Sequence, residues 1–233
     1  MRKSGLILFV AILVSSHVAG QNLSAGARRN VLFTDLMNGL PIARPATGIE
    51  GDPYLNPQWK RAAVKIYDIE DEISNYKVQY NLFFDELAFQ LPTGVKAIDG
   101  SRVERFVFNG DTTATFVNAK QFTLDGTQLR GFFQVLVDGP SPLLKKYYVI
   151  VKDPDYNPAL NSGSRNTRIT KHSDLYYAKE GAVYEVKGKK KLLASFGTHT
   201  SEMEKFMKEH TLYPNDEKSL ITIFTKYNSL LKP

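Results

Sequence analysis

The chain has 233 residues, a formal net charge of +6 and no cysteine. A chain of this length can bury a core without disulfides, and the missing thiols exclude disulfide bridges, thiolate metal ligands and a cysteine nucleophile. Acidic and basic residues are mixed along the chain and do not form the dense basic face of a nucleic-acid-binding protein. We therefore expect no nucleic acid as a partner.

Residues 1–20 have the three parts of a secretory signal peptide. Arg2 and Lys3 form a basic start, an apolar run extends from Leu6 to Val14, and small residues precede a cleavage site after Gly20. The run is shorter than the roughly 20 residues of a membrane-spanning helix. We expect a cleaved, soluble protein in the periplasm or secreted, with no membrane-spanning segment after cleavage. An uncleaved N-terminal anchor is the alternative.

Residues 21–58 predict an irregular segment, because "NGLPIARPATGIEGDP" concentrates glycine and proline. The only tryptophan, Trp59, stands where this segment gives way to the first predicted strand. Taken alone, it suggests an aromatic platform for a ligand. Its position instead predicts a mostly buried plug, with Tyr54 and Leu55, at the edge of a sheet.

Residues 59–200 predict an antiparallel β domain. In "YKVQYNLFFDELAFQL", Val78, Tyr80 and Leu82 alternate with polar residues, and Leu87, Phe89 and Leu91 continue the pattern after a turn at Asp85 and Glu86. This is typical of a hairpin with one buried and one wetter face. Further candidate strands follow about every ten residues, and residues 153–171 predict a long exposed loop. The fold class expected is mainly β, an antiparallel meander forming a sandwich or a barrel-like sheet.

Residues 201–233 predict two amphipathic helices packed on the β domain. Ser201 and Glu204 have capping-box spacing before the first helix, and Asn215 or Asp216 can cap the second. The second helix presents an apolar stripe formed by Leu220, Ile223, Phe224, Tyr227 and Leu231. The basic run from Lys187 to Lys191 predicts a solvated hairpin turn. A role at an anionic lipid or polysaccharide surface is its alternative.

No local pattern predicts a catalytic, cofactor-binding or metal site. His172, His199 and His210 lack metal-ligand spacing, and no GxSxG motif or phosphate-binding glycine loop is present. The segment from Asp153 to Asn157 is similar to the start of a calcium loop but lacks its central glycine, and Ser164 stands where the glutamate belongs.

Adjacent carboxylates are the remaining catalytic candidates. Asp85 with Glu86, and Asp71 with Glu72, have the chemistry of a glycoside hydrolase pair. Their positions in predicted turns account for them without catalysis.

Aromatic residues are abundant, with 14 Phe and 12 Tyr. Adjacent rings within one strand point to opposite faces, so some tyrosines face away from the main core. These rings either form a face for a sugar or a partner protein, or pair across strands and lie under the C-terminal helices.

Taken in order, several segments resemble one family. They are "GDPYLNPQWKRAAV", "YKVQYNLFFDELAFQL", "VERFVF", "GFFQVL", "LLKKYYV" and the paired helices that contain "YN". Together they resemble a group of uncharacterised exported β-rich proteins of Bacteroidota. The resemblance covers nearly all of the chain after the signal peptide and implies origin and architecture, without a catalytic residue or cofactor.

The function expected is therefore an exported, non-enzymatic binding or envelope-associated module. Its candidate partners are a glycan, a lipid or an envelope protein. A hydrolase acting on envelope or extracellular glycans is the alternative.

Overall fold

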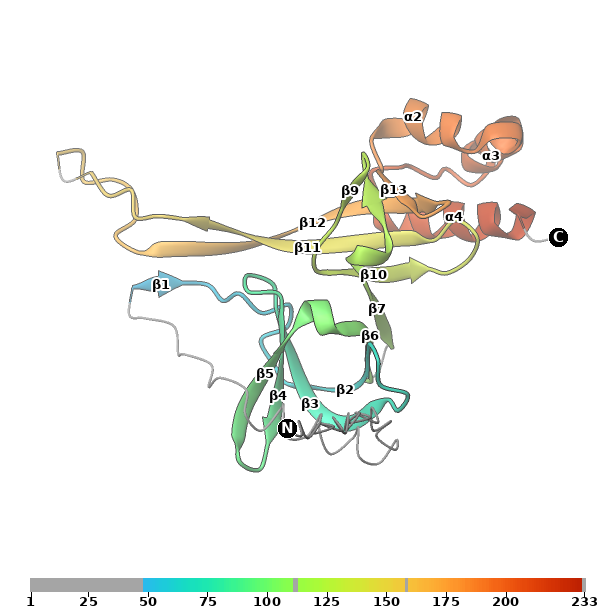
Figure 1. The fold of residues 1–233 in the computed structure, drawn as a ribbon. Helices are drawn as coiled ribbons and strands as arrows, with labels where there is room; N and C mark the ends of the chain where they lie inside the picture. The colour runs from blue at the N-terminus through green and yellow to red at the C-terminus, as the bar shows by residue number, and fades with distance from the viewer. Residues whose placement is uncertain (1–47, 111–112, 158, 232–233) are drawn as a thin grey trace, which may run out of the picture.

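The computed structural model describes residues 48–110, 113–157 and 159–231 (Figure 1). The expected signal peptide and residues 21–47 of the expected irregular segment lie outside the described residues. The strands are β1 (Ile49–Glu50), β2 (Lys60–Ile66), β3 (Ile73–Asn81), β4 (Glu86–Leu91), β5 (Gly94–Asp99), β6 (Val103–Phe108), β7 (Ala114–Asn118), β8 (Thr123–Leu124), β9 (Thr127–Gln128), β10 (Phe132–Val137), β11 (Leu143–Lys152), β12 (Thr167–Lys179) and β13 (Ala182–Glu185). The helices are α2 (Gly188–Ser195), α3 (Thr200–Glu209) and α4 (Glu217–Leu231), with short 3-10 turns η1 (Gly100–Arg102), η2 (Ala119–Gln121) and η3 (Gly197–His199).

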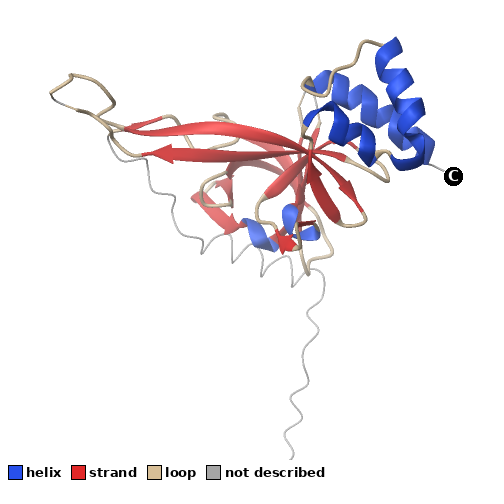
Figure 2. Ribbon diagram, turned by 90° about the horizontal axis from the view of Figure 1, so that it is seen from above, coloured by secondary structure: helices blue, strands red, loops and turns tan. Residues whose placement is uncertain are grey.

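All these strands belong to one open sheet with the strand order β5-β4-β3-β2-β6-β7-β10-β11-β12-β13-β8-β9, and β1 joins it by pairing with β12. Most neighbours are antiparallel, as predicted, while β1 with β12 and β13 with β8 are parallel. The prediction of a mainly β fold with C-terminal helices is confirmed. Seen from above, the helices gather at one end of the molecule and a two-stranded extension projects at the other (Figure 2).

Strands β2 to β7 curve around an aromatic core (Figure 1). Phe106 lies at its centre, stacked on Phe116 with ring centroids 4.7 Å apart, and Tyr80 and Phe132 pack around it. Fully buried rings of this size contribute most of the apolar area removed from water. This half of the sheet is therefore held by packing, without disulfides.

The wetter face predicted for β3 is wrong at two positions. Gln79 and Asn81 are only 7% and 3% exposed. The Gln79 amide donates to the main-chain oxygen of Pro57 at 2.8 Å, and Asn81 Oδ1 accepts from the backbone N–H of Phe83 and Phe84. Buried amides need such partners, so both polar side chains bind backbone that lies outside the regular strands.

The strand β10 carries the core from one half of the sheet to the other. Phe132 packs in the core of β2 to β7, whereas Leu136, on the same face, packs against the C-terminal helices. Phe133 points to the opposite face and packs with Leu144 and Tyr176. The period of two along one strand thus places apolar residues in three clusters.

The two helices predicted after residue 200 are present as α3 and α4, and α2 is a further helix that packs with them over Leu143 of the sheet. The helix α2 begins at Gly188, so the prediction of a hairpin turn from Lys187 to Lys191 is wrong. The cap predicted at Ser201 is also wrong, since α3 begins at Thr200 and has no side-chain cap. Asp216 does cap α4, because its carboxylate accepts from the Ser219 N–H at 2.8 Å.

The apolar stripe of α4 is buried as predicted, apart from the partly buried Leu231. Asn228 adds a polar anchor to the same helix. Its side chain accepts from the N–H of Ser141 at 2.7 Å and donates to the Ser141 oxygen at 2.9 Å. These paired bonds fix the helix to the β10–β11 turn.

The N-terminal segment closes the sheet differently from the prediction. Trp59 has a small exposed fraction, so the mostly buried side chain expected there is present, but it is not among the side chains that pack against the aromatic core. Leu55 packs against the core instead, and its N–H donates to the Tyr80 oxygen at 2.9 Å. The Leu82 N–H in turn donates to the Pro53 oxygen at 2.8 Å, so this segment continues the edge that β2 occupies along β3.

Candidate functional site

The strands β11 and β12 form the most prominent extension of the molecule (Figures 1 and 2). They pair over ten residues, from Leu143 opposite Tyr177 to Lys152 opposite Arg168. The strand β10 accompanies β11 only as far as Lys146. From Tyr147 outward the two strands continue as a ribbon, and we call this ribbon with its tip, residues 147–173, the arm.

The predicted loop at residues 153–171 is shorter in the structure. Strand β12 begins at Thr167, so residues 167–171 belong to the arm. The residues up to Asn166 form its tip. This segment is polar because both its faces lie near solvent, which removes the alternation that marks a half-buried strand.

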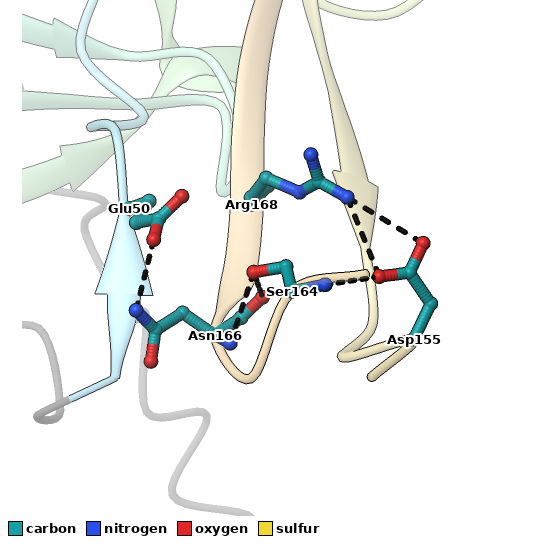
Figure 3. A network of polar contacts seen from close by, with 5 residues as sticks. All are labelled: Glu50, Asp155, Ser164, Asn166 and Arg168. Carbon is teal, nitrogen blue, oxygen red and sulfur yellow. Dashed lines mark hydrogen bonds and ion pairs between the residues drawn. The ribbon is translucent and has the colours of Figure 1, made fainter. Parts of the chain in front are cut away.

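The N-terminal segment braces the arm along β12. Ile49 and Glu50 pair in parallel with Thr167 and Arg168, and the side chain of Asn166 donates to Glu50 at 2.9 Å (Figure 3). An isolated two-stranded ribbon is marginally stable in water. The added strand therefore helps to hold the arm in one direction.

Further along the same edge, Lys171 binds the segment by charge. Its Nζ lies 3.1 Å from Asp52 Oδ2 and 2.9 Å from the Tyr54 main-chain oxygen, to which it donates. Because Leu55 is bonded to β3, this contact joins the arm to the core of the N-terminal half.

The tip of the arm is closed by Asp155. Its carboxylate accepts from the Ser164 N–H at 2.6 Å and lies 3.4 Å from Arg168 Nη2 (Figure 3). The bond from Ser164 lowers the pKa of this carboxyl, and Arg168 lowers it further. Asp155 is thus occupied in closing the tip, and among the described residues no three His, Asp or Glu side chains gather as a metal site requires.

The surface of the arm combines exposed apolar side chains with positive charge. Ile150, Val151 and Leu160 are 40%, 39% and 72% exposed. Within the arm the sequence has four Lys and Arg against two Asp. Exposed apolar residues rimmed by charge are typical of interaction surfaces.

The predicted carboxylate pairs have different surroundings. Asp85 accepts from the Tyr80 hydroxyl at 2.8 Å and from the Gly131 N–H at 3.1 Å, which joins the β3–β4 turn to the start of β10. In the other pair, Glu72 forms an ion pair with Arg105 at 2.8 Å. Both contacts are structural.

Glu86 begins β4 and lies opposite Asp99 of β5. Burial, together with the charges of Asp99 and Asp85, raises the pKa of Glu86. Hydrogen bonds from Ser101 lower the pKa of Asp99. The two carboxyls of this cross-strand pair thus titrate in opposite directions from their ordinary values, a pattern that enzymes use for a general acid beside an ionised partner. The sequence paired Glu86 with Asp85, and only the register of β4 and β5 brings in Asp99.

The three histidines lie on separate elements. His172 stacks on Tyr148 in the arm and shares a 3.0 Å hydrogen bond with Thr170. His199 precedes α3, 4.0 Å from Glu202, and His210 packs on Phe206 at the end of that helix. The structure does not bring them together.

Most tyrosines of the β11–β12 region are paired or covered. Tyr147 donates to Gln134 at 2.9 Å, Tyr148 stacks on His172, and Tyr177 packs against Phe224 of α4. They do not form the continuous aromatic face that the sequence left open. Phe83 and Phe84 in the β3–β4 turn are exposed instead, at 53% and 64%. The sequence did not predict this exposure, because apolar residues in a hairpin predict burial.

No family model, curated protein or solved structure matches the chain. None of the described helices is both long and apolar enough to cross a membrane.

Proposed function

We propose that the protein is an exported binding module that engages a partner protein of the cell envelope through its arm. The observation that carries the proposal is the arm itself, a braced ribbon that projects from the sheet with Ile150, Val151 and Leu160 exposed (Figure 2). Specific contacts hold the arm in its direction and close its tip, including the Lys171–Asp52 ion pair and the hydrogen bond from the Ser164 N–H to Asp155. Such preorganisation reduces the entropy lost when a partner binds.

A variant of the arm tests this function. Val151→Glu combined with Leu160→Glu places charge on two exposed apolar positions and leaves the core untouched. Tyr213→Glu is the matched control, since Tyr213 is 59% exposed and lies between α3 and α4. We expect the double variant to lose retention on isolated envelopes, with the control and the wild type retained equally. Equal retention of all three proteins would contradict the proposal.

Export is a separate part of the proposal and rests on the first twenty residues. Arg2, Lys3 and the apolar run to Val14 have the signal-peptide pattern. N-terminal sequencing of the protein from the producing cells should find Gln21 first. A chain that begins at Met1 in the cytosol would refute export and leave the binding arm to be judged on its own test.

The glycan hydrolase is kept as a second candidate because of the Glu86–Asp99 pair. Glu86 and Asp99 are directly opposite in the antiparallel pair of β4 and β5, and such residues have Cβ atoms about 5 Å apart, so the two carboxyl groups share one face of the sheet. If this candidate holds, glycan cleavage is lost in both Glu86→Gln and Asp99→Asn, while the double arm variant keeps it. Absence of cleavage by the wild type on isolated envelope glycans counts against it.

A further inference from the structure

We infer that the free edge of β11, from Tyr147 to Lys152, binds an extended acidic segment of the partner by adding it to the sheet as a strand. This inference rests on the function proposed above and specifies how the arm would recognise its partner. It is carried by the strand pairing, by the opposite edge of the same ribbon, and by the charge of the arm.

The edge is defined by where β10 ends. Within the described residues, β11 pairs with β10 up to Lys146 and with β12 along its whole length. Among the strands that the structure describes, residues 147–152 therefore have a neighbour on one side only. Six residues of an antiparallel edge direct about three N–H and three C=O groups outward, spaced to receive another strand.

Natural edge strands are usually protected by proline, a bulge or charged side chains, above all lysine. Residues 147–152 read "YYVIVK", and Lys152 is the one residue of that kind among them. The pairing of β11 with β12 is continuous through residues 147–152, without a bulge. Ile150 and Val151 are exposed on opposite faces of the ribbon, so an added strand would find an apolar side chain on each face.

The other edge of the ribbon already holds an extended segment of this kind. Ile49 and Glu50 add to β12 through the backbone. Acidic side chains of that segment then meet the arm, with Glu50 accepting from Asn166 and Asp52 paired with Lys171. The arm thus binds an acidic extended segment by backbone pairing and charge within its own chain.

Charge decides between a partner strand and a second copy of the chain. The arm, residues 147–173, has two more basic than acidic residues. Pairing two arms edge to edge would bring like charge together, which opposes association, whereas an acidic strand is attracted. The partner segment is therefore acidic and belongs to another protein.

The probe is an eight-residue peptide of alternating valine and glutamate, with capped ends, and the control peptide replaces each glutamate by lysine. Binding to the full protein is measured by fluorescence polarisation, and the contact is located by amide hydrogen exchange. We expect the acidic peptide to bind at least about tenfold more tightly than the basic one at low salt, with new protection confined to residues 147–152. Equal affinity for the two peptides, or protection elsewhere, would overturn the inference.

Two proline variants test the backbone contact. Val149→Pro and Ile150→Pro each remove one backbone N–H. Because alternate residues of a strand direct their N–H groups to opposite sides, one variant removes a bond to β12 and the other removes a donor on the free edge. The variant at the outward position should keep the melting temperature of the wild type within a few degrees and lose peptide binding. Retained binding in a proline variant of unchanged stability would contradict strand addition.

A charge variant keeps the test independent of folding. Lys152→Glu should lower the affinity of the protein for the acidic peptide by roughly two- to fivefold, as expected for an exposed ion pair. Lys189→Glu is the control, because Lys189 is exposed in the first turn of α2, where an acidic residue suits the helix dipole. An equal loss in both variants would reduce the effect to net charge and refute a contact at Lys152.

Sedimentation velocity completes the test. A dimer that the outward proline variant abolishes would show that a second copy occupies the edge and would overturn the acidic partner. Failure of both peptides, with envelope retention still lost in the double arm variant, would reject strand addition and leave the binding function standing.

Discussion

Lys171 of β12 binds Asp52 of the N-terminal segment, with Nζ 3.1 Å from Oδ2, and so joins the arm to a segment 119 positions earlier in the sequence. The segment is in turn paired with β3 at Leu55. The direction of the arm therefore depends on contacts that are distant in sequence. This dependence can be tested without disturbing the core.

Gly51 is the first position to test. Its φ is +88°, and a Cβ there would lie 2.3 Å from the main-chain oxygen of Ile169. A side chain must push the segment away from β12, since the obstacle is backbone. Gly51→Ala should raise amide exchange in residues 167–171 by at least about tenfold with little change in β6 and β7. Gly126→Ala is the control, because its glycine also has positive φ and meets nothing within 4 Å.

Asn228 provides a second prediction. It is 3% exposed and makes two hydrogen bonds to Ser141. Asn228→Ala leaves the buried Ser141 N–H without this partner, which should cost about 2–3 kcal/mol in the free energy of unfolding. Denaturant titration measures the change. A loss below about 0.5 kcal/mol would show that α4 does not depend on this anchor.

Trp59 gives a third prediction, because it is largely buried and yet lies outside the aromatic core. Because its side chain is not part of this core, Trp59→Ala should destabilise the protein less than the about 3–5 kcal/mol expected for a large core ring. Phe106→Ala, at a fully buried position, is the comparison. Chemical denaturation of both variants decides, and an equal loss would restore Trp59 as a plug of the core.

Glu86 predicts a pH dependence. Burial and two neighbouring carboxylates raise its pKa above the ordinary 4.5, so the folded protein binds this proton more tightly than the unfolded chain does. The stability linked to it is complete below about pH 4.5 and is lost as the pH rises through the raised pKa. The change in melting temperature caused by Glu86→Gln should therefore be more stabilising near pH 7 than near pH 4. Thermal melts at both pH values measure this, and a pH-independent effect would refute it.

Several elements were predictable because their apolar periodicity is strong. The alternation from Val78 to Leu91 and the stripe of α4 both correspond to buried faces. The helix α2 was not predictable, since its first residues are Gly188 and three lysines and its apolar contact begins only at Leu192. Local composition there favours a turn, and packing of Leu192 in the helix cluster overrides it.

The candidate site was hidden for a different reason. "PLLKKYYVIVK" predicts a strand, but nothing in these letters shows that β10 stops pairing at Lys146. The polar residues from Thr167 to Lys171 likewise predict a loop, because the strand is stabilised by its neighbours on both edges. A free edge is a property of the whole strand order.

Site-specific photocrosslinking in the producing cells tests the central claim most directly, that the arm is the surface which meets a partner. A photoreactive residue is placed at Ile150 or at Leu160 on the arm, and at the exposed Glu204 on α3 as control. The account predicts a discrete cross-linked product of higher mass from both arm positions and none from Glu204. Products from Glu204 alone, or the same products from all three positions, would contradict it.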